Sequence, residues 1–102
     1  MELYQLNYFK TVAETKHFTR AAEKLHIAQP SLSKAIAKLE AELDVPLFER
    51  NNKSVYLTEY GSAFLQRVSK ILIEVDEAVE ELQDMAGNGS GDIRIGSCGV
   101  FT

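Results

Sequence analysis

Residues 18–39 contain two short apolar runs separated by a break, and this arrangement restricts the possible folds more than any other feature. The sequence there is FTRAAEKLHIAQPSLSKAIAKL. The first run predicts a helix that is capped by Thr19 and ends near Leu25. Its apolar spacing turns three side chains inward: Phe18, Ala22 and Leu25. Residues 26–29 then form the break between the two runs.

The run after the break predicts a second helix. Pro30 suits its first turn, because a proline lacks only an N–H that has no helical partner there. The helix must end by Val45, because Pro46 disfavours helical geometry in the residue before it. Its apolar stripe consists of Leu32, Ile36, Leu39 and Leu43. Two helices joined by a short turn, the second beginning with polar side chains, are typical of a helix-turn-helix.

Spacing predicts the remaining elements as well. Residues 2–15 are predicted to form an amphipathic helix, because their apolar side chains recur at three- and four-residue steps. Residues 47–50 and 55–58 are short apolar or β-branched runs around the turn-forming set Asn51-Asn52-Lys53-Ser54, which predicts a β-hairpin. Thr58 is expected to cap a long helix that extends to about residue 86, with Glu59 in its first turn.

The composition of the chain changes after residue 86. Residues 87–91 read GNGSG, the composition of a flexible linker. Residues 92–96 alternate like a strand, but no further element in the sequence could pair with that strand. We therefore expect the sequence to be part of a longer protein.

The start of the helix after the break carries side chains suited to reading DNA. In a helix-turn-helix, the second helix places its N-terminal turn in the major groove. Glutamine can bind adenine through two hydrogen bonds, serine tolerates several bases, and lysine reaches guanine or a phosphate. Pro30 offers apolar surface to a thymine methyl group. The candidate base-reading residues are Gln29, Pro30, Ser31, Ser33 and Lys34.

A hairpin after a helix-turn-helix makes a winged domain, and Lys53 at its tip would meet a phosphate or the minor groove. The pattern also has ordinary explanations, since helix-break-helix sequences occur in helical bundles and lysines occur at many exposed turns. A helical dimerisation or protein-interaction module without DNA binding is therefore the alternative.

Charge is distributed unevenly around a net value of −4. Residues 1–70 carry ten Lys or Arg against eight Asp or Glu, whereas residues 71–102 carry one Arg against seven acids. The N-terminal part is thus mildly basic and suits DNA, and the rest is strongly acidic.

The sequence gives no support for a disulfide-bonded, metal-binding, catalytic or membrane-spanning protein. Cys98 is the single cysteine, so no internal disulfide can form, and His17 and His26 have no second pair of metal ligands nearby. No glycine-rich phosphate loop opens a helix, and no nucleophile and base are suitably placed, so we expect no enzyme. No apolar run approaches the ~20 residues of a membrane span, and the start lacks a signal peptide. We expect a reduced, cytoplasmic protein without a cofactor in these residues.

Residues 2–86 resemble the N-terminal domain of LysR-type transcriptional regulators, and the GDIRIG segment at 91–96 resembles the first strand of that family's effector-binding domain. The matching positions are Ala21-Ala22, Gln29-Pro30, Leu32-Ser33, Ile36, Leu39-Glu40, Leu47-Phe48, Arg50, Leu57-Thr58 and Gly61. The implied fold is mainly α: a winged helix-turn-helix of three helices and a hairpin at 1–58, and a linker helix at 59–86. A hinge at 87–91 and the start of an effector-binding domain at 92–102 would follow.

The resemblance also implies partners. The family binds an interrupted palindrome in double-stranded DNA as a dimer, usually within a tetramer, and a small-molecule effector binds the C-terminal domain. The implied DNA contacts are Gln29, Pro30, Ser31, Ser33 and Lys34, with Lys53 on the wing, and the cations Arg20, Lys38 and Arg50 complete the predicted set.

Three positions depart from the family pattern. Lys34 and Lys53 stand where arginine is usual in the family. Lysine cannot form the bidentate hydrogen bonds of arginine, so Lys34 could contact either a guanine or a phosphate. Asp44 replaces a glycine after the recognition helix, and aspartate tolerates left-handed geometry better than most residues. His17 stands where a small residue is typical.

The long helix carries an apolar seam with alternating spacings of four and three residues, the pattern of helix pairing. The seam predicts dimerisation through Phe64, Val68, Ile71, Val75, Ala78, Leu82 and Met85. An antiparallel pair would set each acidic C-terminal half against the half that contains Arg67 and Lys70, so electrostatics favours it over a parallel pair. We expect the first two turns to pack on their own domain and residues 68–85 to pack on a partner helix.

Overall fold

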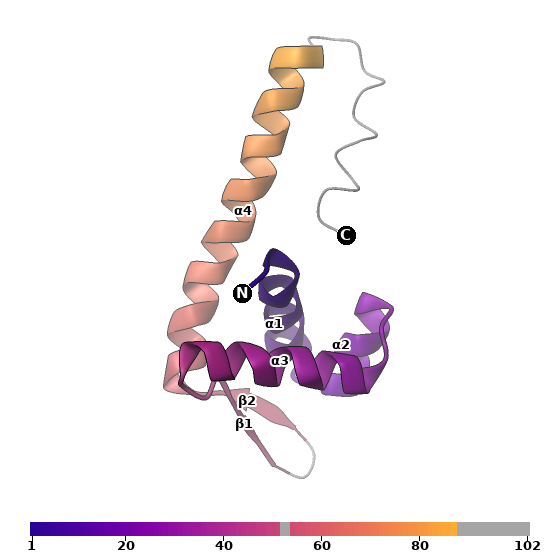
Figure 1. Ribbon diagram of the computed structural model, residues 1–102, viewed down its shortest axis with the longest axis vertical. Coiled ribbons are helices and arrows are strands. Elements are labelled where there is room, and N and C mark those ends of the chain that lie inside the picture. The colour runs from indigo at the N-terminus through magenta and orange to yellow at the C-terminus, as the bar shows by residue number, and fades with distance from the viewer. Residues whose placement is uncertain (52–53, 88–102) are drawn as a thin grey trace. The chain divides into compact units, whose positions relative to one another are not determined.

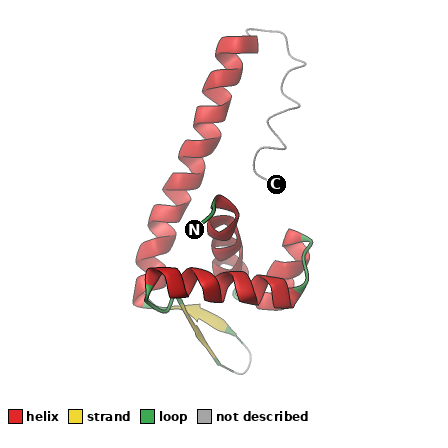
Figure 2. Cartoon of the chain, viewed as in Figure 1, coloured by secondary structure: helices red, strands yellow, loops and turns green. Residues whose placement is uncertain are grey.

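The computed structural model describes residues 1–51 and 54–87 (Figure 1). Its elements, in order, are α1 (Leu3–Thr15), α2 (Phe18–Leu25), α3 (Gln29–Leu43), β1 (Phe48–Arg50), β2 (Val55–Leu57) and α4 (Glu59–Gly87) (Figure 2). The strands pair antiparallel, with Phe48 opposite Leu57. The predicted mainly α fold of three helices, a hairpin and a long helix is confirmed. Most of the predicted hinge and all of the predicted strand at 92–96 lie outside the described residues.

The chain divides into two compact units, Met1–Ser69 and Lys70–Thr102. The first unit contains α1, α2, α3, the hairpin and the beginning of α4. Its boundary falls eleven residues later than the domain boundary expected at residue 58, because the first turns of α4 share the core of this unit.

Three helices of the first unit end at a non-glycine residue in left-handed geometry: Lys16, His26 and Asp44. The expected left-handed turn at Asp44 is confirmed, with φ at 60°. The backbone N–H of Asp44 donates to the carbonyl of Glu40 at 2.8 Å, which closes the last turn of α3.

The predicted cap of α2 is wrong by two residues. His17 is the N-cap, and its Nδ1 accepts a hydrogen bond from the backbone N–H of Arg20 at 3.3 Å. Thr19 lies inside the helix. An imidazole nitrogen can accept from a free N–H of the first turn as a serine or aspartate oxygen does, which accounts for a histidine at a position where the family has a small residue.

The core of the first unit is built around the ring of Phe9, which is fully buried. Its centroid lies 5.3 Å from that of Phe48 on β1 and 5.2 Å from that of Phe64 on α4. Leu32, Ile36 and Leu39 bury the apolar stripe of α3 against this core, as predicted. This cluster of aromatic rings thus connects α1, the hairpin and the start of α4.

Two residues of the predicted dimer seam lie in this core. Val68 is fully buried within the unit and Phe64 packs on Phe9. Both side chains already have partners in their own chain, because the first turns of α4 pack on the domain. The exposed part of the seam therefore begins at Ile71, which is 41% exposed.

Candidate nucleic-acid interface

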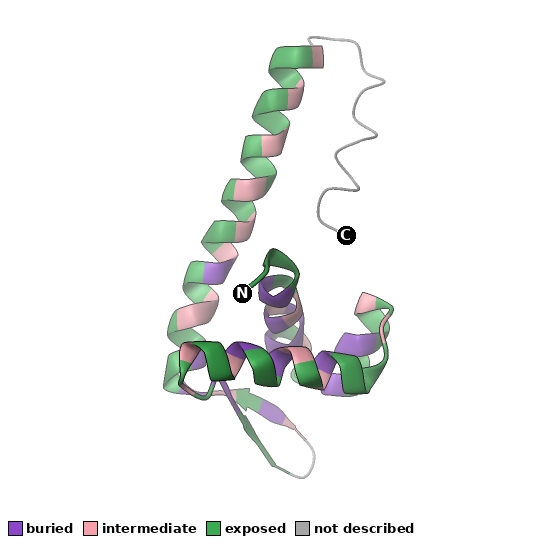
Figure 3. Cartoon of the chain, viewed as in Figure 1, coloured by how far each residue is buried: buried purple, intermediate pink, exposed green. Residues whose placement is uncertain are grey.

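The first turns of α3 present the predicted base-reading residues on the surface. Gln29, Pro30, Ser31 and Lys34 are exposed and Ser33 is half-buried. Figure 3 shows how buried and exposed residues alternate along the helices of this unit. α3 begins at Gln29, one residue earlier than expected, with Ala28 as N-cap and Pro30 in the first turn. The Gln29 amide donates to the Ser33 hydroxyl at 3.3 Å, so these two side chains share one face of the helix as predicted.

The opposite side of α3 is anchored by both apolar and polar contacts. Leu32, Ile36 and Leu39 are completely buried. Gln5 of α1 is 2% exposed, and its side-chain amide donates to the carbonyl of Ala35 at 3.4 Å while its oxygen accepts from the N–H of Glu2 at 2.8 Å. Because one side is held so firmly, the position of the exposed side is set by the core.

Glu40 connects α3 to the wing, a role that the sequence analysis missed. Its Oε2 accepts hydrogen bonds from the backbone N–H groups of Leu47 at 2.7 Å and Phe48 at 3.1 Å. These donors lie where β1 begins. A carboxylate that accepts two N–H groups forms strong hydrogen bonds, so Glu40 holds the start of the wing against α3. The available signal was an acidic residue within an otherwise apolar stripe, one turn before the end of α3.

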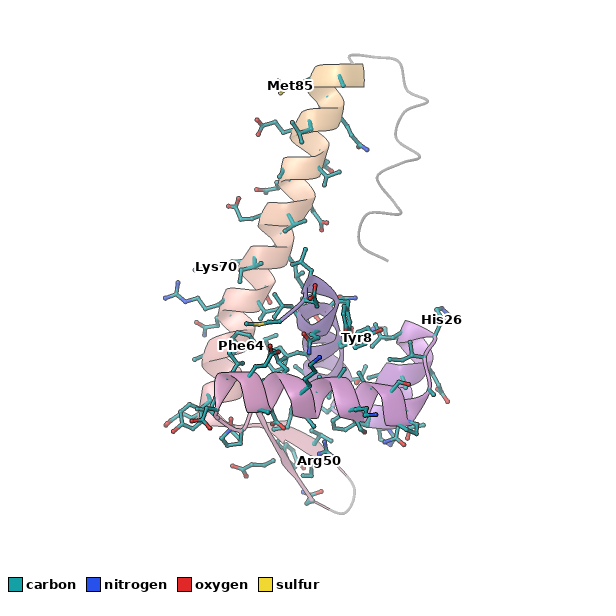
Figure 4. All side chains as sticks on the ribbon, in the orientation of Figure 1. Tyr8, His26, Arg50, Phe64, Lys70 and Met85 are labelled. Carbon is teal, nitrogen blue, oxygen red and sulfur yellow. The ribbon has the colours of Figure 1, made fainter. Side chains whose placement is uncertain are left out.

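The hairpin is also tied to the α1–α2 connection. The N–H of Val55 donates to the carbonyl of Lys16 at 3.3 Å. The guanidinium of Arg50, which is labelled in Figure 4, lies 4.3 Å from the ring centroid of Phe18 in a cation–π contact. Arg50 stays exposed, so the stack orients its N–H donors without covering them. Lys53, predicted for the tip of the wing, lies outside the described residues.

Tyr56 is a further polar group on the wing that the sequence analysis did not single out. It is 50% exposed. Hydrogen bonds from the side chains of Ser54 and then Asn51 lower the pKa of its phenol, because they stabilise the ionised oxygen. No periodic pattern marks this residue, since its exposure follows from the register of a three-residue strand.

The other predicted cations are exposed, and no salt bridge among the described residues involves them. Arg20, Lys34 and Lys38 all lie on the surface. Within residues 1–51 and 54–87, salt bridges join the N-terminus to Glu42 and Lys10 to Glu14, and none involves these three cations. Their charges are therefore free to meet phosphates.

The described part of the chain contains no cluster of His, Cys, Asp and Glu suited to a metal ion. Among its helices, none is both long and apolar enough to cross a membrane.

The sequence of this winged helix-turn-helix matches a known family. Residues 3–62 match bacterial regulatory helix-turn-helix proteins of the lysR family. The chain belongs to the LysR family. This result confirms the resemblance seen in the sequence, and the family is one of transcriptional regulators rather than enzymes.

Curated LysR-type relatives are similar along almost the whole chain. The regulator BudR of Klebsiella aerogenes is 47% identical over 96 residues, which cover 94% of this chain and 67% of that protein. The uncharacterised regulator YybE of Bacillus subtilis is 45% identical over 96 residues, 94% of this chain. The match spans only 33% of YybE, so this chain corresponds to about a third of that relative.

Solved LysR structures share the fold. The DNA-binding domain of BenM in complex with benA site 1 DNA has a TM-score of 0.81 at 45% identity, covering 83% of this chain and 99% of that one. The DNA complex of the CbnR DNA-binding domain also has a TM-score of 0.81, at 37% identity, covering 84% of this chain and 99% of that one.

Proposed function

We propose that residues 1–58 bind double-stranded DNA in a sequence-specific manner, as the DNA-binding part of a LysR-type transcriptional regulator. The observation that carries the proposal is the exposed start of α3, where short donors and acceptors stand on a helix anchored from behind. That the related BenM and CbnR domains were solved in complex with DNA supports it.

The side chains divide into two groups by reach and charge. Gln29, Pro30, Ser31 and Ser33 would face base edges in the major groove. Arg20, Lys38, Arg50 and Lys53 would bind phosphates, which position a protein on DNA without reading sequence. Lys34 borders the base-reading face, and its single point charge favours a phosphate over guanine.

Dimerisation would follow from the exposed seam of α4. We infer that the interface uses Ile71, Val75, Ala78, Leu82 and Met85, with the two helices antiparallel. Two linked reading helices then suit an interrupted palindrome. In the longer protein we infer a tetramer, a small-molecule effector bound by a C-terminal domain, and a cytoplasmic location.

Selection of bound duplexes from a random pool, followed by titration at several salt concentrations, tests the proposal. We expect an enriched palindromic sequence, and a logarithm of the association constant that falls linearly with the logarithm of salt concentration. A scrambled duplex of equal length is the control. Absence of salt-dependent duplex binding would instead favour the protein-interaction module.

A further inference from the structure

The turn between α1 and α2 holds a lysine in a backbone conformation that lysines rarely adopt. Lys16 ends α1 with a φ of 58°, and its N–H donates to the carbonyl of Val12 at 2.7 Å. The other left-handed helix ends are His26 and Asp44, whose residue types are enriched in this region whereas lysine is not. Glycine would make the same turn without strain. A lysine kept at this position therefore indicates a use for its side chain outside the fold.

The backbone fixes Lys16 beside the base of the wing. Its carbonyl accepts the hydrogen bond from the N–H of Val55 in β2 at 3.3 Å. Val55 stands directly opposite Arg50 in the antiparallel pair, and the guanidinium of Arg50 is stacked on Phe18, two residues after Lys16. Two cations from distant parts of the sequence are thus brought to one corner of the domain.

The charges at this corner are accessible and are not neutralised within the domain. Lys16 and Arg50 are both exposed. Glu49 is the acid next to Arg50 on β1, but the salt bridges of residues 1–51 and 54–87 involve none of these three side chains. An anion placed beside the two cations would therefore gain from both charges.

Tyr56 adds a neutral hydrogen-bond donor at the same corner. Its side chain is 50% exposed. Hydrogen bonds from the side chains of Ser54 and then Asn51 lower the pKa of the phenol, and the nearby ammonium of Lys16 lowers that pKa further. A more acidic O–H group donates a stronger hydrogen bond to an anionic oxygen. The corner thus combines a positive charge with a polarised hydroxyl.

We propose that the Lys16 ammonium and the Tyr56 hydroxyl together bind one backbone phosphate of duplex DNA at the base of the wing. Both groups donate hydrogen bonds, and phosphate oxygens accept them. A phosphate contact positions the protein without reading bases, so this pair acts equally on every DNA sequence. The inference rests on the proposed DNA binding and adds two residues to the predicted set of contacts.

Lys16→Gly in the 102-residue chain separates the role of the side chain from that of the turn. We expect a higher melting temperature, because glycine relieves the strain, together with duplex binding that is about three- to tenfold weaker. The salt slope should fall by about one unit per protomer, since one phosphate contact is lost. Asp44→Gly relieves the same geometry at the end of α3 and should raise the melting temperature without weakening DNA binding. Lys16→Arg keeps the charge and should keep the affinity.

Tyr56→Phe keeps the aromatic ring and removes only the hydroxyl. Affinity should fall about two- to fivefold on the selected palindrome and on a scrambled duplex alike, with an unchanged salt slope because no charge is lost. Tyr4→Phe removes an exposed phenol hydroxyl from α1 and is the matched control. If one phosphate binds both groups, combining Lys16→Gly with Tyr56→Phe should weaken binding by less than the product of the two single effects.

The possible results distinguish this contact from DNA binding as such. If Lys16→Gly bound duplexes as tightly and with the same salt slope as the unmodified chain, the inference would be overturned while the proposed DNA binding stood. A lower melting temperature of Lys16→Gly would also overturn it, because the lysine would then serve the fold. Independent effects in the double variant would place the two groups on different phosphates and contradict the shared site. Absence of salt-dependent duplex binding by the unmodified chain would overturn both proposals.

Discussion

Asp44 ends α3 in left-handed geometry, which costs a non-glycine residue about 1 kcal/mol. Asp44→Gly should therefore raise the free energy of unfolding by up to about 1 kcal/mol, because glycine adopts this geometry without strain. Chemical denaturation measures the change. Ala41→Gly, one turn earlier on the exposed side of α3, should lower stability by about 1 kcal/mol. A loss of stability in Asp44→Gly would contradict the strain argument.

Gly61 is required because there is no room for a side chain at this position. A Cβ at this position would overlap the carbonyl oxygen of Leu47 and crowd the side chain of Leu57. Thr58 caps the first turn of α4, as predicted, because its hydroxyl accepts a hydrogen bond from the N–H of Gly61 at 3.0 Å. The same hydroxyl donates to the carbonyl of Pro46 at 2.7 Å. The end of the wing and the start of α4 are thus in direct backbone contact.

Gly61→Ala should destabilise the domain by about 1–3 kcal/mol, the usual cost of overpacking, because the clash is with backbone that cannot rotate away. Thermal unfolding of the variant measures it. Gly87→Ala is the matched control, since a Cβ there would meet nothing within 4 Å. Equal melting temperatures of the two variants would contradict the close approach.

Among the elements, α3 and the wing are joined by Glu40. Glu40→Ala leaves the N–H groups of Leu47 and Phe48 without their acceptor and should cost about 1–3 kcal/mol of stability. Glu40→Gln keeps one acceptor oxygen and should lose less. Glu42→Ala, which removes an exposed ion pair with the N-terminus, should cost under about 1 kcal/mol. If Glu40→Ala matched Glu42→Ala in denaturation, the carboxylate would not anchor the wing.

The two DNA-binding elements should differ in what they contribute to binding. Gln29→Ala should cost about 1–3 kcal/mol on the preferred site and relax discrimination at one base position. Lys53→Ala should weaken binding to all sequences alike and lower the salt slope by about one unit. Titrations against matched and mismatched duplexes at several salt concentrations separate these effects. If Gln29→Ala lost affinity equally on every sequence, α3 would not read bases as proposed.

At the scale of the whole molecule, dimerisation depends on the exposed seam of α4. Ile71→Glu combined with Val75→Glu should yield monomers in analytical ultracentrifugation, because charges replace apolar contacts between helices. Binding to a palindrome should weaken as well, since the two half-sites lose their link. Ile73→Glu, on the other side of the helix, is the control. A double variant that remains dimeric would show that the interface lies elsewhere.

The sequence alone determined the order of elements, the winged helix-turn-helix and the family. Apolar periodicity, Pro30, Pro46 and Thr58 act over a few residues, so local patterns contain the information. The common face of Gln29 and Ser33 and the left-handed turn at Asp44 are local in the same sense.

Only the tertiary structure decided the features that join distant segments. Glu40 reaches residues seven and eight positions away, Arg50 stacks on Phe18, and Gly61 lies against Leu47. The a/d spacing of α4 marks an apolar face without saying what covers it, so Phe64 and Val68 were predicted for the dimer although they pack in the domain core. A helix buries an apolar face equally well against its own domain or a second chain, and only the positions of the other elements distinguish the two.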